Sequence, residues 1–210
     1  MAAPAFIDRR DAGDALAKTL RDEIDPPAAV LGIPRGGVVV AARVAAILAL
    51  PLGVVVTKKL GAPGNPELGI GAIAPGVRVL EPDVLAALSV SERWLTRESA
   101  RVDQEVARRT ETYGAAIDVR GVTAVIVDDG VATGSTARAA GLWARHAGAS
   151  RVVLAVPVAP MGVERRVADA FDEVVAVLTP SDLRAVGQYY ADFGQVGDAE
   201  VTALLRAGEA

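Results

Sequence analysis

The feature that most constrains the fold of this chain is a repeated alternation of short β-branched runs with longer alanine-rich stretches. Short β-branched runs are typical of buried strands, and longer amphipathic stretches are typical of helices. Their alternation predicts βαβ units, in which parallel strands form a sheet whose two faces carry helices. We therefore expect an α/β fold with a mostly parallel, twisted sheet flanked by helices.

The expected strands are residues 28–33, 53–58, 123–127, 151–156 and 173–178, and the expected helices are residues 37–50, 135–147 and 162–170. A long excursion separates the second strand from the third. It predicts a hairpin of residues 70–73 and 77–80, followed by a charged helix over residues 91–113. Because the apolar stripe of that helix is thin, we expect it to serve packing or a dimer contact.

Composition excludes several classes of function. The 210 residues fit one domain and include no cysteine and one histidine, His146, so thiolate zinc sites and multi-histidine metal sites are ruled out. A net charge of −4 argues against a nucleic-acid partner. Neither a signal peptide nor a membrane-spanning run is found, so we expect a cytoplasmic protein without a membrane partner.

The first motif with chemical content is LGIPRGG, residues 31–37, at a predicted strand-to-helix junction. Its glycines allow a tight turn with exposed amides, and Arg35 adds a cation at the positive end of a helix. Such a turn suits an anionic oxygen and also serves plain chain reversal.

The second motif, VIVDDGVATGST (residues 125–136), is more specific. Asp128 and Asp129 follow a buried strand, where two carboxylates are costly unless something pairs with them. Sugar hydroxyls and a hydrated divalent cation are suitable partners. The residues after them offer consecutive amides, hydroxyls and a helix N-terminus, which together form a phosphate cradle. The spacing matches neither a Walker A loop nor a dinucleotide fingerprint.

This second motif resembles the signature of the type I phosphoribosyltransferase family: a strand, two acidic residues, two mostly apolar residues and a Thr/Gly-rich phosphate loop. One departure is Gly130, where relatives usually have a branched apolar residue, so we expect a looser turn. The resemblance implies that Asp128 and Asp129 hold the ribose hydroxyls of 5-phosphoribosyl pyrophosphate. It also implies Mg²⁺, bound by the pair through water or the ribose hydroxyls.

Other candidate site residues follow from the same resemblance. The 5-phosphate would be held by Ala132, Thr133, Gly134, Ser135 and Thr136. The pyrophosphate would be held by the loop of Pro34, Arg35, Gly36 and Gly37. Lys58 and Lys59 stand where several relatives place a basic pair near the pyrophosphate, and otherwise form a solvated strand end.

The resemblance covers residues 28–180 and implies one phosphoribosyltransferase-like domain of residues 1–210. A small hood over the base would come from the termini and from the insertion of residues 60–120. Tyr189, Tyr190 and Phe193 are candidates to contact a base there, and otherwise anchor the tail to the core. We also expect a homodimer.

The implied reaction transfers a phosphoribosyl group to a nitrogen nucleophile, such as a nucleobase, and releases pyrophosphate. Ala132 falls where 6-oxopurine-specific relatives have an aspartate, so hypoxanthine and guanine are disfavoured. The alternative is a regulatory domain that binds the donor or a nucleotide without catalysis. An acidic pocket of the response-regulator kind would leave the ATGST segment unexplained.

Overall fold

The centre of the computed structural model, which describes residues 4–114 and 117–208, is a five-stranded parallel sheet with the order β2-β1-β6-β7-β8. Its strands are β1 (Ala28–Gly32), β2 (Leu52–Val54), β6 (Thr123–Val127), β7 (Arg151–Val158) and β8 (Glu173–Leu178). All four neighbouring pairs run parallel. The expected α/β fold with a mostly parallel sheet is therefore confirmed.

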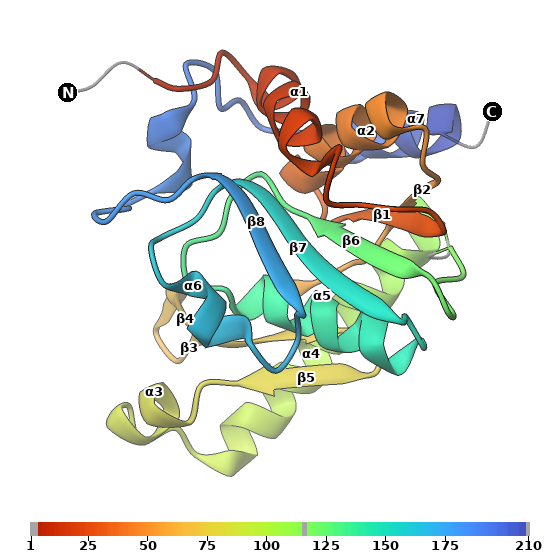
Figure 1. Ribbon diagram of the computed structural model, residues 1–210. Coiled ribbons are helices and arrows are strands. Elements are labelled where there is room, and N and C mark those ends of the chain that lie inside the picture. The colour runs from red at the N-terminus through yellow and green to blue at the C-terminus, as the bar shows by residue number, and fades with distance from the viewer. Residues whose placement is uncertain (1–3, 115–116, 209–210) are drawn as a thin grey trace.

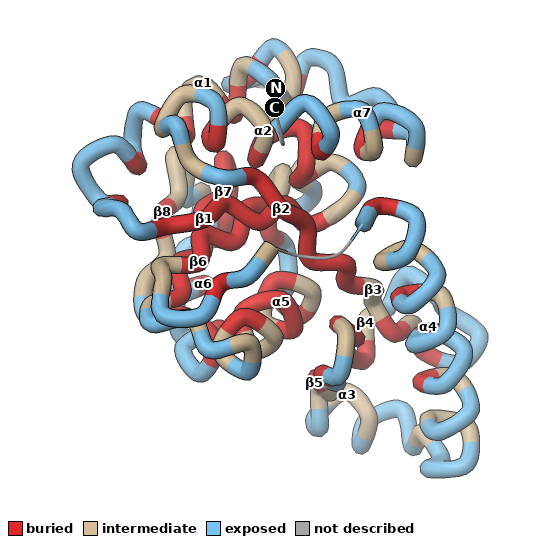
Figure 2. The backbone as a smooth tube through the Cα atoms, turned by 90° about the vertical axis from the view of Figure 1, so that its right-hand side faces the viewer, coloured by how far each residue is buried: buried red, intermediate tan, exposed pale blue. Residues whose placement is uncertain are grey.

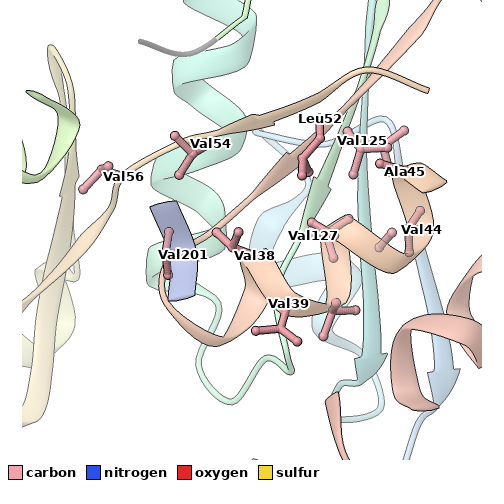
Figure 3. Packing of buried hydrophobic residues seen from close by; sticks show 14 of the residues in the cluster. Val38, Val39, Val44, Ala45, Leu52, Val54, Val56, Val125, Val127 and Val201 are labelled. Carbon is pink, nitrogen blue, oxygen red and sulfur yellow. The ribbon is translucent and has the colours of Figure 1, made fainter. Parts of the chain in front are cut away.

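Helices cover both faces of this sheet (Figure 1). One face carries α1 (Arg9–Leu20), α2 (Gly36–Leu48) and α7 (Asp198–Gly208), and the other carries α5 (Ser135–His146) and α6 (Val163–Val167). Alternate residues of β6 point into the two cores, Val125 and Val127 toward α2 and Ile126 toward α5. Figure 3 shows the first of these cores, in which Val38 of α2 and Val201 of α7 lie near the strand residues. Burial on both faces accounts for the β-branched composition of the strand.

The excursion between β2 and β6 forms a second, antiparallel sheet of β3 (Lys58–Ala62), β4 (Asn65–Ala74) and β5 (Val77–Leu80). The predicted hairpin is confirmed, with Ala74 opposite Val77. Two helices follow, α3 (Pro82–Ala87) and α4 (Glu92–Tyr113). The small sheet lies between α4 and α5 (Figure 2): Ile73 packs in the core that includes Val102, and Ala72 packs with Ala139.

The second predicted strand is wrong over half of its length. β2 ends at Val54, and Lys58 begins β3 of the other sheet. Between them Val55 and Val56 are almost fully buried in the two separate cores. The β-branched run therefore marks a buried crossing from one sheet to the other.

Helices α1 and α7 were not predicted from the sequence. In α1 the buried face consists largely of small residues, with Leu16 and Leu20 its only large apolar members among those described. Asp8 caps the helix, accepting hydrogen bonds from the backbone N–H groups of Arg10 and Asp11. A face of alanine and glycine gives little hydrophobic periodicity, which is why the pattern was missed.

Close contact between α1 and α2 requires Gly13. A Cβ atom there would lie 2.7 Å from the Arg43 Cβ and 2.9 Å from the Val40 carbonyl oxygen. We predict that Gly13→Val forces the two helices apart and lowers the free energy of unfolding by about 1 to 3 kcal/mol in urea titrations. Lys18→Val, at an exposed position of the same helix, is the control. Equal unfolding midpoints for the two variants would contradict the close packing.

Candidate functional site

Two loops meet at the carboxyl ends of β1 and β6. The strand register pairs Gly32 with Val127, and the Ile33 backbone N–H donates to the Val127 carbonyl at 2.8 Å. Residues 34–37 leave the sheet beside residues 128–134 as a direct result. The two motifs that lie far apart in the sequence therefore face each other.

The glycines of the first motif make room for the acidic pair of the second. A Cβ atom on Gly36 would lie 1.9 Å from Asp129 Oδ2. One on Gly37 would lie 2.8 Å from the Asp128 Cα and 3.0 Å from its Oδ1. Any larger residue would displace the carboxylates, so the loop and the acidic pair form one packed unit.

One oxygen of each carboxylate in the pair accepts a hydrogen bond from the protein. Asp128 Oδ1 accepts from the backbone N–H of Asp129 at 2.9 Å, and Asp129 Oδ2 accepts from Arg9 Nε at 2.7 Å. Within the described part of the chain, no hydrogen bond reaches Asp128 Oδ2 or Asp129 Oδ1. Neither is among the buried polar atoms that lack a partner, so both reach solvent. Two carboxylate oxygens are therefore open to a ligand.

The electrostatics of the pair favour a cationic or hydrogen-bond-donating ligand. Burial raises the pKa of Asp128 well above its ordinary value, and the neighbouring charge of Asp129 raises it further. Burial also raises the pKa of Asp129, while the hydrogen bond and charge of Arg9 oppose that rise. The negative charge of the two carboxylates is therefore only partly compensated in the unliganded protein.

Residues 130–134 form the loop that leads into α5. Gly134 precedes the helix with φ of 93°, a left-handed conformation that favours glycine. Ala132 and Thr133 are exposed beside it, and Thr136 is partly buried in the first turn. The segment presents the N-terminus of a helix of 12 residues. This is the arrangement that binds anionic oxygens.

The hydroxyl of Ser135 points elsewhere. It donates to Glu81 Oε1 at 2.8 Å, and Thr133 Oγ1 lies 3.5 Å from it. Glu81 precedes α3 and belongs to the excursion, so this bond links the small sheet to the loop. Of the three hydroxyls expected in the cradle, that of Ser135 is already bound within the protein.

The loop at Gly130 is tightly packed, which corrects the expectation of a looser turn. A Cβ atom on Gly130 would lie 2.4 Å from Val186 Cγ1 and 2.9 Å from Val158 Cγ1. Side chains from β7 and from the short helix η1 (Val186–Tyr189) occupy the space that a branched residue at position 130 would need. Packing of Val158 and Val186 against Gly130 therefore keeps the turn in place.

The loop of residues 34–37 borders a cavity. Pro34 is partly buried, whereas Arg35 is exposed and its Nη1 lies 3.9 Å from Asp198 Oδ1 at the start of α7. A cavity of about 350 Å³ is lined by Arg9, Arg35, Gly36 and residues 193–196. Two guanidinium groups thus border one opening next to the acidic pair.

The two lysines of β3 are engaged in ion pairs. Lys58 pairs with Glu105 of α4, and Lys59 donates to the Glu67 carbonyl oxygen at 2.8 Å. In the part of the chain that the structure covers, neither lysine has an ion pair or hydrogen bond with the acidic pair or with residues 34–37. Both lysines are therefore engaged by glutamates of the excursion and not by the other candidate residues.

The C-terminal segment, which we define as residues 186–196, pairs with the start of the chain. Tyr189 accepts a backbone hydrogen bond from Phe6 at 2.9 Å. Tyr190 is 5% exposed, its ring lies 5.4 Å from that of Phe6, and its hydroxyl donates to the Asp129 carbonyl oxygen at 2.6 Å. Tyr190 therefore anchors the tail. Phe193 stays 39% exposed, 4.9 Å from the Tyr190 ring.

Sequence reasoning missed two residues that shape the site, Arg9 and Glu81. Arg9 lies 120 positions from Asp129, and Glu81 lies 54 positions from Ser135. Both stand in segments without a recognisable motif. The only sequence signal near Arg9 is the Asp8 N-cap, which marks a helix start and says nothing of a distant partner.

The model of the phosphoribosyl transferase domain family matches residues 7–192 of this chain. The chain belongs to this family. Membership confirms the resemblance seen in the acidic motif and extends it at both ends, to include Arg9 and Tyr190. It supports a transferase function of the phosphoribosyl type.

Known relatives agree with the family assignment. A Mycobacterium tuberculosis protein, provisionally named a phosphoribosyl transferase, is 46% identical over 204 residues, which are 95% of this chain and 46% of that protein. The chain thus spans about half the length of the curated relatives it matches. A crystal structure from Thermus thermophilus has a TM-score of 0.78 and 44% identity, covering 95% of this chain and 97% of the other. A Neisseria gonorrhoeae protein with bound ppGpp, at 16% identity, TM-score 0.50 and 99% coverage of both chains, shows the fold alone.

No helix in residues 4–114 and 117–208 has the length and apolar character needed to cross a membrane. Over the same ranges, no group of three or more His, Asp or Glu residues could hold a metal ion. A metal at the acidic pair would therefore take most of its ligands from water or from a bound substrate.

The raised pKa of Asp128 predicts that its charge destabilises the unliganded protein. A carboxyl group whose folded-state pKa exceeds its unfolded value contributes stability that is lost as the pH rises through the folded value. We expect Asp128→Asn to raise Tm at pH 8 by a few degrees, corresponding to about 1 kcal/mol, and to raise it less at pH 5. Calorimetric scans at the two pH values test this. A variant that is less stable than the parent at pH 8 would contradict it.

Proposed function

We propose that this protein binds 5-phosphoribosyl 1-pyrophosphate with Mg²⁺ and transfers the phosphoribosyl group to a nitrogen nucleophile such as a nucleobase. The observation that carries the proposal is the pair of open oxygens, Asp128 Oδ2 and Asp129 Oδ1, between two amide-rich loops. Adjacent carboxylate oxygens suit a vicinal diol, which can donate one hydrogen bond to each. The two loops offer a place for a phosphate on either side of the ribose.

The 5-phosphate of the donor would sit at the N-terminus of α5. The amides of residues 132–136 and the hydroxyls of Thr133 and Thr136 are the proposed donors, aided by the helix dipole. Ser135 would contribute its amide alone, because its hydroxyl is bound to Glu81. Glu81 would then act by fixing the loop that binds the phosphate.

The pyrophosphate would lie along Pro34, Arg35, Gly36 and Gly37, with Arg35 as the cation that we assign to it. Arg35 is exposed, and its contact with Asp198 is 3.9 Å long and half open to solvent, so it is weak. Lys58 and Lys59 could join only by leaving their glutamate partners. We therefore give Arg35 the main part in neutralising the leaving group.

The acidic pair also fits Mg²⁺, because a hard cation prefers oxygen ligands and commonly keeps several waters. The open oxygens of Asp128 and Asp129 would hold it through water or together with the ribose hydroxyls. When bound, the ion would neutralise charge on the departing pyrophosphate. The protein groups would hold the ribose so that the anomeric carbon is open to attack from the side opposite the leaving group.

In the proposed reaction the bond from the nucleophilic nitrogen to the anomeric carbon forms as the bond to pyrophosphate breaks. Positive charge develops on the ribose and negative charge on the leaving oxygen, so the work of the protein is mainly electrostatic. The C-terminal segment, residues 4–7 and the insertion of residues 60–120 would form the hood over the acceptor within one domain. Phe193, which is partly exposed, is the aromatic residue best placed to meet an acceptor. We further propose that the enzyme works as a cytoplasmic homodimer.

Donor binding should require both acidic residues. We predict that Asp128→Asn with Asp129→Asn weakens binding of the phosphoribosyl donor in the presence of Mg²⁺, because charge-assisted hydrogen bonds are lost at about 1.5 to 3 kcal/mol each. Isothermal titration calorimetry measures the loss. Asp169→Asn, at a surface ion pair with Arg138, is the matched control. If the double variant bound the donor as tightly as the parent, the assignment of Asp128 and Asp129 to the ribose hydroxyls would be wrong.

The acceptor should not be a 6-oxopurine. Ala132 offers a methyl group where a carboxylate could manage a proton of the attacked base, so hypoxanthine and guanine should turn over poorly. The test is pyrophosphate release from donor and Mg²⁺ with a panel of bases and amines, against Asp128→Asn as the inactive control. Efficient guanine turnover would overturn the Ala132 argument. Tight donor binding without turnover of any acceptor would favour a regulatory domain over an enzyme.

A further inference from the structure

Arg9 joins two parts of the site, the acidic pair and the C-terminal segment, through one guanidinium group. Its Nε donates to Asp129 Oδ2 at 2.7 Å, and its Nη1 donates to the Gly194 carbonyl oxygen at 2.8 Å. Its Cζ lies 3.9 Å from the centre of the Phe193 ring, a cation–π contact. The Arg9 side chain is 12% exposed and that of Asp129 is 16% exposed. The contact is therefore shielded from solvent, unlike the ion pairs of the surface.

The arginine pairs of the described residues fall into two kinds, and the Arg9 pair, like those of Arg43, Arg145 and Arg151, engages a single carboxylate oxygen. Other pairs engage both oxygens. Arg138 uses two nitrogens and engages both oxygens of Asp169. Arg120 likewise engages both oxygens of Asp118. Such two-nitrogen pairs leave little of the carboxylate for a ligand.

Arg9 engages one oxygen of Asp129 and leaves the other open. Its Nη1, which could complete a two-nitrogen pair, is directed instead to the Gly194 carbonyl. The Phe193 ring holds the plane of the guanidinium group from one face. The C-terminal segment therefore sets the angle of Arg9, and Arg9 sets the rotation of the Asp129 carboxylate.

We propose that Arg9 is a positioning residue of the donor site: by holding Asp129 Oδ2 it turns Asp129 Oδ1 toward the ribose of the donor, and it ties the C-terminal segment to that carboxylate. This inference rests on the proposed function. It assigns a role in the transferase site to the N-terminal helix, which lies outside both sequence motifs.

Three variants test the proposal by calorimetric titration with the phosphoribosyl donor and Mg²⁺. Arg9→Gln should weaken donor binding about tenfold or more, because the carboxylate loses its fixed orientation. Arg9→Lys should recover part of that loss, because an ammonium group reaches one oxygen but lacks the planar fork that also binds the carbonyl. Arg10→Gln, the exposed neighbour on the same helix, should bind like the parent. Melting temperatures of all three show whether folding is intact.

A double-mutant cycle separates positioning from a general structural role. If Arg9 acts through Asp129, adding Arg9→Gln to Asp129→Asn should weaken donor binding by less than about threefold more. The proposal would be overturned if the double variant lost donor affinity by the product of the two single losses. It would also be overturned if Arg9→Gln bound the donor more tightly than the parent. Should Arg9→Gln melt below the assay temperature, the same cycle with Arg9→Lys decides it. A parent protein that does not bind the donor would instead overturn the proposed function, so the two failures are distinguishable.

Discussion

The structure around the candidate site depends on placing two adjacent carboxylates at the end of a buried strand. Such a placement costs free energy, because burial disfavours their charges. Gly36 and Gly37 give the carboxylates room, and Arg9 neutralises one of them. The Tyr190 hydroxyl, from the C-terminal segment, donates to the backbone carbonyl of Asp129. These residues come from three separate parts of the chain: the start of α2, the start of α1 and the C-terminal segment. The acidic pair thus organises the contacts between the sheet, the first helices and the C-terminal segment.

Much of the central sheet could be predicted, because its strands are buried on both faces and their β-branched runs are continuous. Residues 123–127 and 173–178 were predicted with the bounds that β6 and β8 have. The end of β2 could not be predicted, since Val55 and Val56 are as buried in the crossing as in a strand. Helix α1 was missed because alanine and glycine make up much of its inner face, and α7 was missed because it buries only Val201 and Leu205 among its described residues.

The candidate site was predictable where a motif is contiguous and unpredictable where the contact is made across the chain. Asp128, Asp129 and the loop of residues 34–37 follow from local patterns of charge and glycine, and parallel register then brings them together. Arg9 and Glu81 are ordinary charged residues of a helix start and a strand end. Their roles arise only from packing: α1 lies against α2, and the small sheet lies against α5. The sequence offered two roles for Tyr190, contact with a base or, more commonly for aromatics near a C-terminus, anchoring of the tail, and burial of its ring supports the anchor.

The bond from the Tyr190 hydroxyl to the Asp129 carbonyl has a consequence for biosynthesis. Protein chains leave the ribosome from the N-terminus, so the residues of one domain become available for folding in their order along the chain. The residues of all five central strands and of the acidic pair are outside the ribosome once β8 has emerged, but Phe193 and Gly194, which orient Arg9, emerge later. At that stage the acidic pair lacks the contacts that orient Asp129. The C-terminal segment, although it is synthesised after every strand of the central sheet, therefore completes the site.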